Sequence, residues 1–164
     1  MPHFKYVHST IASKLFRNTP CKCKSCGKNS DLMCPLEEIC PQCISDGSAI
    51  KVGYQSFSGS VREQMLKHED KVIELYGKTP RVSCWNEFDW PDHCDDFCQY
   101  YGDKPVDEIR SEEAYELISK FVNWKPDQDD IVHLKNNYVV PSMASVHKFV
   151  CMVCSKELLV FDLG

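Results

Sequence analysis

Apolar residues recur at helical spacing in two segments of the chain. Between residues 60 and 77 they follow the period of an α-helix, with Ser58 or Ser60 available as the cap and Gly77 as the stop. Between residues 106 and 122 they form one apolar face, and Asp, Glu and Lys occupy the opposite face. The pattern therefore predicts two main helices.

Strand-like patterns are shorter. Residues 4–7 predict a strand near the start, and residues 146–151 and 158–161 predict the two strands of a hairpin. Lys, Ser, Asn and Pro interrupt every apolar run between residues 21 and 43, so loops and short hairpins are expected there. The acidic segment 126–130 is expected to be an exposed loop.

The chain contains eleven cysteines, an odd number, and their share falls short of the roughly 8 to 10% typical of secreted disulfide scaffolds. In a reducing compartment such thiols usually hold metal. The cysteines of this chain are therefore expected to be metal ligands.

The strongest motif combines Cys23-x-x-Cys26 with Cys40-x-x-Cys43. A two-residue spacer lets both thiolates of a tight knuckle face one zinc ion at about 2.3 Å, and Gly27 supplies the permissive backbone that such a knuckle needs. Four sulfurs leave no coordination position for water, so a structural zinc ion is expected here. Unliganded thiols are the alternative interpretation.

A second group is split along the chain. Cys94 and Cys98 have a three-residue spacer that suits one turn of a helix, and Cys151-x-x-Cys154 is the remaining pair with knuckle spacing. These four cysteines are expected to bind a second structural zinc ion.

Other residues provide alternatives for this second site. The main alternative replaces one of its cysteines by His93 or Cys84, although His93 is favoured as a neighbour of the ligands rather than as a ligand. Cys21, Cys34 and Cys84 are otherwise expected to be small buried hydrophobic residues.

Enzyme signatures are missing from the sequence. The run His68-Glu69-Asp70 matches neither the motif of zinc deaminases nor that of zincins, and no glycine-rich phosphate loop occurs. No catalytic or cofactor-binding residue is therefore proposed. A metalloenzyme with His93 or His147 at an open zinc position remains the weakest alternative.

The formal net charge is −5, and two zinc ions with eight thiolates would bring it to about −9. Such an acidic molecule is a poor nucleic-acid binder. No signal-peptide pattern opens the chain, and no apolar stretch approaches the roughly 18 residues that span a bilayer. A cytoplasmic location without membrane contact is expected.

Together these patterns predict an α+β fold: a small single domain over residues 1–164 with zinc-ribbon-like knuckles, two main helices and short antiparallel hairpins. Residues 21–50 form the first zinc-knuckle lobe in this prediction. Residues 84–164 hold the second zinc site, a helix and the C-terminal hairpin.

Several short motifs occur together along nearly the full length. They are Phe4-x-Tyr6, Cys23-x-x-Cys26-Gly27, Cys40-Pro41-x-Cys43-Ile44-x-Asp46-Gly47-Ser48-Ala49, Thr79-Pro80, Trp85, Trp90-x-x-His93-Cys94-x-Asp96-x-x-Cys98, Gly102 and Cys151-x-x-Cys154. In these motifs the chain resembles the CbrC family of small bacterial proteins, which is named after a colicin-tolerance phenotype. It departs from the family at residues 7–10, where a His-Pro-Asp-Pro turn is common, and it has Ser155 where a knuckle usually has glycine. The resemblance implies a bacterial cytoplasmic protein linked to survival of colicin or toxin stress, with no established enzymatic activity.

The leading hypothesis is a non-enzymatic zinc protein that binds a protein partner, in tolerance of or immunity to a bacteriocin or polymorphic toxin. An acidic surface would suit a basic toxin domain, because nuclease toxins must themselves bind polyanions. The candidate contact residues are Asp92, Asp95, Asp96, Asp127, Asp129 and Asp130. The alternative is a zinc-ribbon module that binds nucleic acid or a transcription component, for which Lys14, Lys22, Lys24 and Lys28 form a thin basic stripe.

Overall fold

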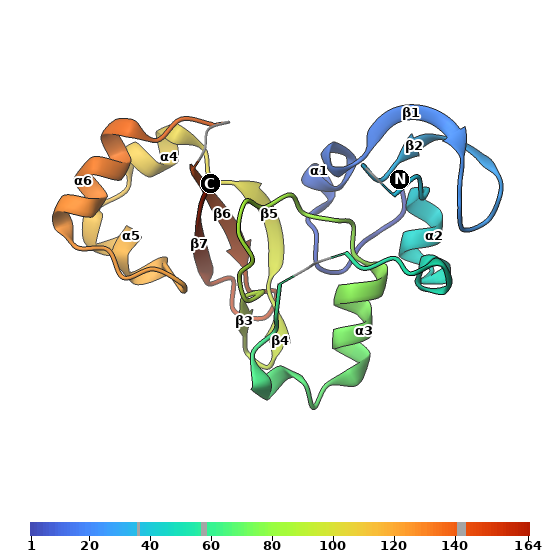
Figure 1. Cartoon of the computed structure of the whole chain (residues 1–164). Coiled ribbons are helices and arrows are strands. Elements are labelled where there is room, and N and C mark those ends of the chain that lie inside the picture. The colour runs from blue at the N-terminus through green and yellow to red at the C-terminus, as the bar shows by residue number, and fades with distance from the viewer. Residues whose placement is uncertain (36, 57–58, 141–143) are drawn as a thin grey trace. The chain divides into compact units, whose positions relative to one another are not determined.

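The structure is a computed structural model that describes residues 1–35, 37–56, 59–140 and 144–164. The chain divides into two compact units, an N-terminal unit Met1–Ser83 and a C-terminal unit Cys84–Gly164. Both units combine short helices with antiparallel strands, so the predicted α+β class is confirmed (Figure 1).

The N-terminal unit contains one two-stranded sheet and several short helices. Its elements are α1 (Ser9–Ala12), η1 (Ser13–Leu15), β1 (Arg17–Lys22), β2 (Asn29–Met33), α2 (Pro41–Ser45), η2 (Ser48–Val52), η3 (Glu63–Met65) and α3 (Glu69–Lys78). Strands β1 and β2 pair antiparallel, with a register shift between Asn18 and Cys21. Pro20 lies inside this shift and has no N–H to donate to the sheet, which accounts for the irregular pairing. The short hairpin expected in the cysteine-rich stretch is confirmed.

The start of the chain differs from the prediction. Residues 4–7 contain a turn and a single bridge position rather than a strand. Phe4, Tyr6 and Val7 are nevertheless buried, and the Phe4 ring stacks on the Phe16 ring with 5.8 Å between centroids. The apolar pattern there reflects burial of a compact turn.

Only the second half of the predicted helix 60–77 is an α-helix. α3 begins after His68, with Glu69 and Asp70 in its first turn and Lys78 in its last turn, which suits the helix dipole. Ser60 does not cap it, and Ser58 lies outside the described residues. Gly77 lies inside the helix rather than at its end. A β-carbon there would collide with the Ile50 side chain of η2, so any other residue would require this side chain to move.

The C-terminal unit is built on a three-stranded antiparallel sheet. Its elements are β3 (Asp92–His93), β4 (Asp96–Phe97), β5 (Gln99–Asp103), α4 (Val106–Ser111), α5 (Ala114–Lys120), α6 (Gln128–Asn137), β6 (Ala144–Val150) and β7 (Glu157–Leu163). The sheet order is β5-β6-β7, and the register of β6 on β7 runs from Ala144↔Leu163 to Val150↔Glu157. The predicted C-terminal hairpin is therefore confirmed.

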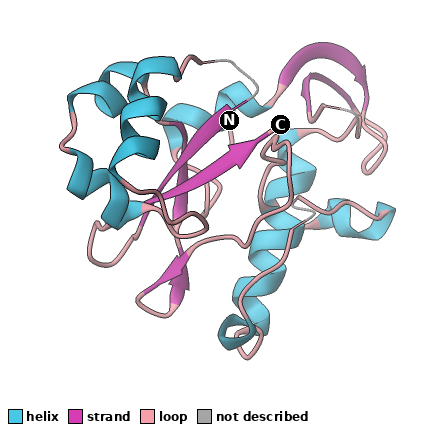
Figure 2. Ribbon diagram, turned by 60° about the vertical axis from the view of Figure 1, so that its left-hand side comes forward, coloured by secondary structure: helices cyan, strands magenta, loops and turns pink. Residues whose placement is uncertain are grey.

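Three helices pack together against this sheet. In Figure 1, α4, α5 and α6 lie beside one another next to β7, and Figure 2 shows the same helices beside the strands from a second direction. Their buried core consists of apolar side chains from α4, α5, α6, β6 and β7. These are Ile109, Leu117, Phe121, Ile131, Leu134, Tyr138, Val146 and Leu159.

The single helix predicted over residues 106–122 is wrong, because the structure has two helices there. Glu112 and Glu113 both have an extended backbone and separate α4 from α5.

The acidic segment 126–130 was also predicted wrongly, since α6 begins within it. The Asp127 carboxylate accepts the Asp130 N–H at 2.9 Å, and the Asp130 carboxylate accepts the Asp127 N–H at 3.0 Å. This reciprocal capping box starts a helix.

None of the helices in the described ranges has the length and apolar character needed to span a membrane.

Candidate metal centres

The first group of cysteines joins a hairpin turn to a helix. Cys23 and Cys26 lie in the turn that follows β1, and Cys40 and Cys43 lie at and just inside the N-terminus of α2. The turn closes through two backbone hydrogen bonds: Cys23 N–H donates to the Lys28 carbonyl, and Gly27 N–H donates to the Cys23 carbonyl, both at 2.8 Å. Gly27 has a φ of +73°, as expected for the glycine of a knuckle.

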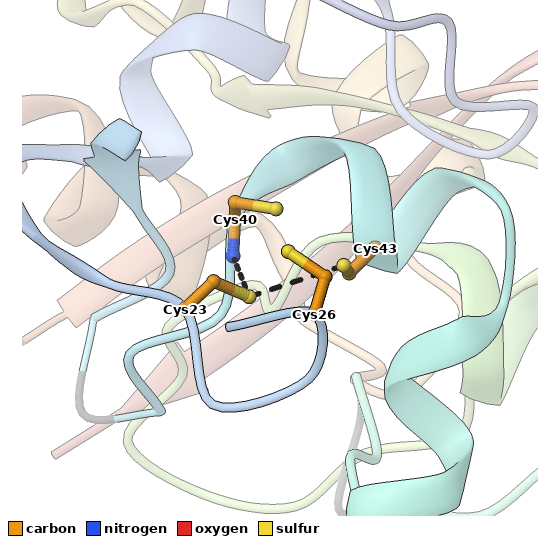
Figure 3. A group of neighbouring side chains, drawn as sticks. All are labelled: Cys23, Cys26, Cys40 and Cys43. Carbon is orange, nitrogen blue, oxygen red and sulfur yellow. Dashed lines mark hydrogen bonds between the residues drawn. The ribbon is translucent and has the colours of Figure 1, made fainter. Parts of the chain in front are cut away.

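The four sulfur atoms converge on one point (Figure 3). All of them lie within 4.8 Å of one another, and Cys23 Sγ is 3.9 Å from Cys43 Sγ. A tetrahedral zinc ion about 2.3 Å from each sulfur would hold the sulfurs about 3.8 Å apart. The predicted set Cys23, Cys26, Cys40 and Cys43 is thus brought together with the dimensions of a metal site.

Backbone N–H groups prepare one thiol of this group for metal binding. Burial raises the pKa of Cys23, but the N–H groups of Cys26, Cys40 and Ser25 stabilise its thiolate and lower the pKa to about 6. The Cys40 N–H donates to this sulfur at 3.3 Å. Burial and the neighbouring Cys43 and Cys23 sulfurs raise the pKa of Cys40 to about 12. Filling the group with a cation therefore releases protons, which makes metal affinity depend on pH.

The second group contains one histidine and three cysteines, namely His93, Cys94, Cys151 and Cys154. Their ligand atoms also lie within 4.8 Å of one another. The His93 Nδ1 atom is 3.2 Å from Cys94 Sγ and 3.3 Å from Cys154 Sγ. The Cys151 thiol points at the His93 carbonyl oxygen at 3.6 Å.

The two turns that carry this group have different geometries. His93 ends β3, and Cys94 and Asp95 form a tight two-residue turn to β4 with φ values of +52° and +60°. Two positive φ angles in a two-residue hairpin loop are typical of a type I′ turn.

Cys151 and Cys154 form a knuckle between β6 and β7 with the same hydrogen bonds as the first. Ser155 N–H donates to the Cys151 carbonyl, and Cys151 N–H donates to the Lys156 carbonyl, both at 2.9 Å. Ser155, with a φ of +60°, occupies the position that Gly27 has in the first knuckle.

The predicted second set differs from this group at one position. The structure places His93 beside Cys94, Cys151 and Cys154, whereas Cys98 does not belong to the group. Cys98 is fully buried beyond β4, and its carbonyl accepts the Trp90 indole N–H at 2.9 Å. The prediction assumed a helical turn, in which residues four apart share a face. In the hairpin, Cys94 is at the tip and Cys98 is past the end of the returning strand.

In the second group, as in the first, the pKa of one cysteine is lowered and that of another is raised. Burial raises the pKa of Cys151, but the N–H groups of Cys154 and Val153 and the His93 side chain outweigh it and lower the pKa to about 6. The neighbouring Cys154 sulfur, more than burial, raises the pKa of Cys94 to about 11. One thiolate in each group is thus ready to receive a metal ion.

Comparison with known proteins identifies a family and several bacterial relatives of this chain. The model of the "Uncharacterised protein family (UPF0167)" matches residues 1–163. The chain belongs to this family. It is 27% identical over 169 residues to "UPF0167 protein PA1536" of Pseudomonas aeruginosa, covering 95% of this chain and 93% of that protein. It is also 27% identical over 137 residues to "UPF0167 protein Mb2317" of Mycobacterium bovis, covering 77% of this chain and 69% of the relative. No solved structure matches the chain.

The remaining cysteines of this UPF0167 protein lie outside both groups. Cys34 is buried, and burial raises its pKa, so it behaves as a small hydrophobic residue. Cys21 and Cys84 are half-buried rather than buried as expected. Cys84 is not a member of the second group, so the alternative that used it as a ligand is not favoured.

His147 has a structural role in the UPF0167 protein. Its Nδ1 atom is 2.7 Å from Asp103 Oδ1, and its Nε2 atom is 3.3 Å from Asp162 Oδ2. The imidazole is buried in the sheet, and both ring nitrogens face carboxylates. His147 belongs to neither metal group of the described residues, so the alternative that placed it at an open zinc position is not favoured.

The sequence prediction underestimated His93. The signal available in the sequence was the run Asp92-His93-Cys94-Asp95-Asp96, in which polar residues with a tolerance for positive φ surround the cysteine. Such a run favours a tight hairpin turn over a helix, and in a tight hairpin the residue directly before the cysteine can reach the same ion.

Proposed function

We propose that this UPF0167 protein is a non-enzymatic zinc protein whose two metal ions hold a surface for a protein partner. The observation that carries the proposal is the composition of the two groups: four sulfurs in one, three sulfurs and an imidazole nitrogen in the other. Four protein ligands fill a tetrahedral ion completely, which is the arrangement of structural zinc rather than of catalytic zinc. Sulfur-rich tetrahedral sites select zinc or iron–sulfur chemistry over magnesium or calcium.

Metal analysis of the purified native protein tests the zinc part of the proposal. Two zinc ions per chain are expected, with X-ray absorption giving an average of about 3.5 sulfurs and 0.5 imidazole nitrogens per ion. Iron in place of zinc, or fewer than two ions per chain, would contradict it.

The charge of the two units differs in sign and supports a basic partner for the C-terminal unit. Residues 84–164 carry 16 Asp and Glu against 7 Lys and Arg, a formal charge of −9. Residues 1–83 carry 12 Lys and Arg against 8 Asp and Glu, a formal charge of +4. The overall value of −5 conceals this difference. Complementary charge mainly accelerates association and selects partners.

Exposed carboxylates gather on the helical layer of the C-terminal unit. Asp107, Glu108, Glu113, Glu116, Asp127, Asp129 and Asp130 are exposed on or at the ends of α4, α5 and α6. Asp92, one of the contact residues suggested by the sequence, is only 5% exposed and cannot take part. The helical layer is therefore the proposed contact surface, with Tyr115, 66% exposed, as an aromatic anchor beside Glu116.

The partner that we propose is a basic domain of a bacteriocin or other toxin. The resemblance to the CbrC family supports a role in toxin tolerance or immunity, and nuclease toxins carry the positive surface that an acidic protein would bind. Calorimetry with basic toxin domains encoded by neighbouring genes tests this. We expect a complex that weakens several-fold in the variant Glu113→Gln/Glu116→Gln/Asp129→Asn. The variant Glu63→Gln/Glu69→Gln, which changes exposed carboxylates of the N-terminal unit, is the matched control, and absence of any complex would contradict the proposal.

The positive charge of the N-terminal unit favours nucleic acid as a second candidate partner. Arg17 and Lys22 are exposed on β1, and Lys24 and Lys28 are exposed in the first knuckle. Lys24 is paired with Glu38 at 2.9 Å, which leaves a small basic surface. An electrophoretic shift at low salt that is lost in Arg17→Gln/Lys28→Gln would favour this candidate over a toxin domain.

A further inference from the structure

The two metal groups differ in the accessibility of their sulfur-bearing residues. In the first group Cys23, Cys40 and Cys43 are buried and Cys26 is exposed. A cavity of about 490 Å³ borders Cys26, Cys40 and Cys43, and of these three cysteines only Cys26 is exposed.

In the second group Cys94 and Cys154 are both exposed, His93 is half-buried, and Cys151 alone is buried. The two exposed sulfurs belong to different turns and lie within 4.8 Å of each other. The second group therefore has two neighbouring cysteines that are exposed, whereas the first group has one.

The backbone of the second group is also more strained. In the first knuckle the residue with positive φ is Gly27, which adopts this conformation at little cost. In the second group Cys94, Asp95 and Ser155 all have φ values between +52° and +60°. Asp tolerates this conformation, but Cys and Ser are disfavoured in it, so Cys94 and Ser155 hold backbone strain that favours opening of the two turns.

The two units depend on their metal groups to different extents. A buried cluster of the C-terminal unit is formed by α4, α5, α6, β6 and β7, and it includes none of the second group's ligands, although Cys151 itself is buried. The second group lies instead at the tips of two hairpins, β3–β4 and β6–β7. In the N-terminal unit the cysteines join the β1–β2 hairpin to α2, and β1 itself is almost entirely exposed. We therefore expect the C-terminal unit to stay folded without its ion and the β1–β2 hairpin to unfold without the first ion.

We propose that the second centre is a reversible oxidation site, at which hydrogen peroxide converts Cys94 and Cys154 to a disulfide and the metal ion is released. This inference rests on the proposed function, because it requires a metal ion in the second group. Exposure favours Cys94 and Cys154 over Cys151 as the reacting pair, and two sulfurs within 4.8 Å of each other need only side-chain rotations and small backbone shifts to bond.

The chemistry balances without a further reactant. As a metal ligand Cys94 is a thiolate; it attacks one peroxide oxygen, the O–O bond breaks, and a sulfenic acid forms on Cys94. The Cys154 thiolate then displaces hydroxide from that sulfur and the S–S bond forms. The two sulfurs lose two electrons in total, and the peroxide, with two protons from solvent, becomes two water molecules. The metal ion keeps its charge and leaves, because Cys151 and His93 alone supply only two ligands.

The test follows metal release from the full chain loaded with two metal ions, in the presence of a chromogenic chelator and peroxide. We expect release of one ion per chain, a Cys94–Cys154 crosslinked peptide in the mass spectrum, and recovery after reduction and addition of zinc. Simultaneous loss of both ions, loss from the first group first, or release without this crosslink would overturn the proposal. A native chain with fewer than two ions would instead contradict the proposed function.

Two matched variants test whether backbone strain at the knuckles sets the order in which the two metal ions are released. Ser155→Gly restores the usual knuckle residue and is expected to slow peroxide-driven release about fivefold. Gly27→Ala introduces the same kind of strain into the first knuckle, where a β-carbon would meet only Lys22 Cε at 3.6 Å. It is expected to accelerate loss from the first group and leave the second unchanged. Equal release rates in Ser155→Gly and the wild-type chain would show that strain does not set the order of release.

Discussion

The Nδ1 atom of His93 lies 3.3 Å from the Sγ atom of Cys154, although the two residues are 61 positions apart. This contact brings the tip of the β3–β4 hairpin to the knuckle between β6 and β7. A metal ion at this point would therefore connect two turns that have no backbone pairing with each other in the described sheets. Whether the fourth ligand is His93 or Cys98 decides which part of the β3–β4 hairpin is attached to this knuckle.

Replacing His93 is expected to remove one of two metal ions. In His93→Ala the second group keeps three cysteines, and the open position is filled by water, so affinity falls by at least about 100-fold. Cys98→Ala is the matched control, because Cys98 is buried outside the group. Native mass spectrometry should give one ion for His93→Ala and two for Cys98→Ala. The reverse result would restore Cys98 as the ligand.

Loss of the first ion is expected to unfold the hairpin of the N-terminal unit. A structural zinc ion contributes on the order of 10 kcal/mol of folding free energy, which exceeds what the exposed β1 strand can supply. In Cys43→Ala, hydrogen exchange should lose protection in β1, β2 and α2 and keep it in β6 and β7. Cys21→Ala, which changes a cysteine of β1 outside the group, should preserve protection everywhere. Full protection in metal-free Cys43→Ala would contradict a structural role for this ion.

The first centre could be predicted from the sequence because each of its pairs is local. The two-residue spacer and Gly27 fix a knuckle through short-range hydrogen bonds, whatever the rest of the chain does. The second centre was only partly predictable, since its ligand set depends on whether residues 94–97 form a helix or a hairpin. Positive φ at Cys94 and Asp95 decides this, and an apolar pattern carries no information about φ.

The apolar pattern also failed to predict where two of the helices begin or end. The apolar pattern did not predict α6, because this helix starts in an acidic segment at the Asp127 and Asp130 capping box. The break at Glu112 could not be seen in the pattern either. The Glu112 carboxylate pairs with Lys104 at 3.0 Å, a contact set by the tertiary fold.

Asp162 is expected to be essential for attaching the start of the C-terminal unit to its sheet. Its buried carboxylate accepts the N–H groups of Trp85 at 2.6 Å and Asn86 at 2.8 Å, and it faces the His147 Nε2 atom. In Asp162→Asn one acceptor becomes an NH₂ donor facing these donors, which should lower the free energy of unfolding by about 2–3 kcal/mol. Denaturant titration measures this. Asp129→Asn, at an exposed position of α6, should change stability by less than about 0.5 kcal/mol.

The stability of the C-terminal unit is expected to fall in acid through Glu157. Burial would raise the pKa of Glu157, but hydrogen bonds and charge from Lys104 and Lys148 outweigh it and lower the pKa from 4.5 to about 2. Lys104 Nζ lies 2.5 Å from this carboxylate and is itself only 2% exposed. A lowered pKa in the folded state means that the ionised carboxylate stabilises the fold above about pH 4.5. That contribution is lost as the pH falls from 4.5 towards 2.

In Glu157→Gln this contribution is absent at every pH. The wild-type chain should therefore exceed the variant by about 2 kcal/mol at pH 7, after allowance for partial solvent screening, and the difference should vanish near pH 2. Urea titrations of both chains across this range, monitored by a probe in the C-terminal unit, measure the difference, so acid release of metal common to both cancels. Glu113→Gln, an exposed change in the same unit, should give no pH-dependent difference. A difference for Glu157→Gln that persists unchanged at pH 2 would mean that the carboxylate acts through packing and not through its charge.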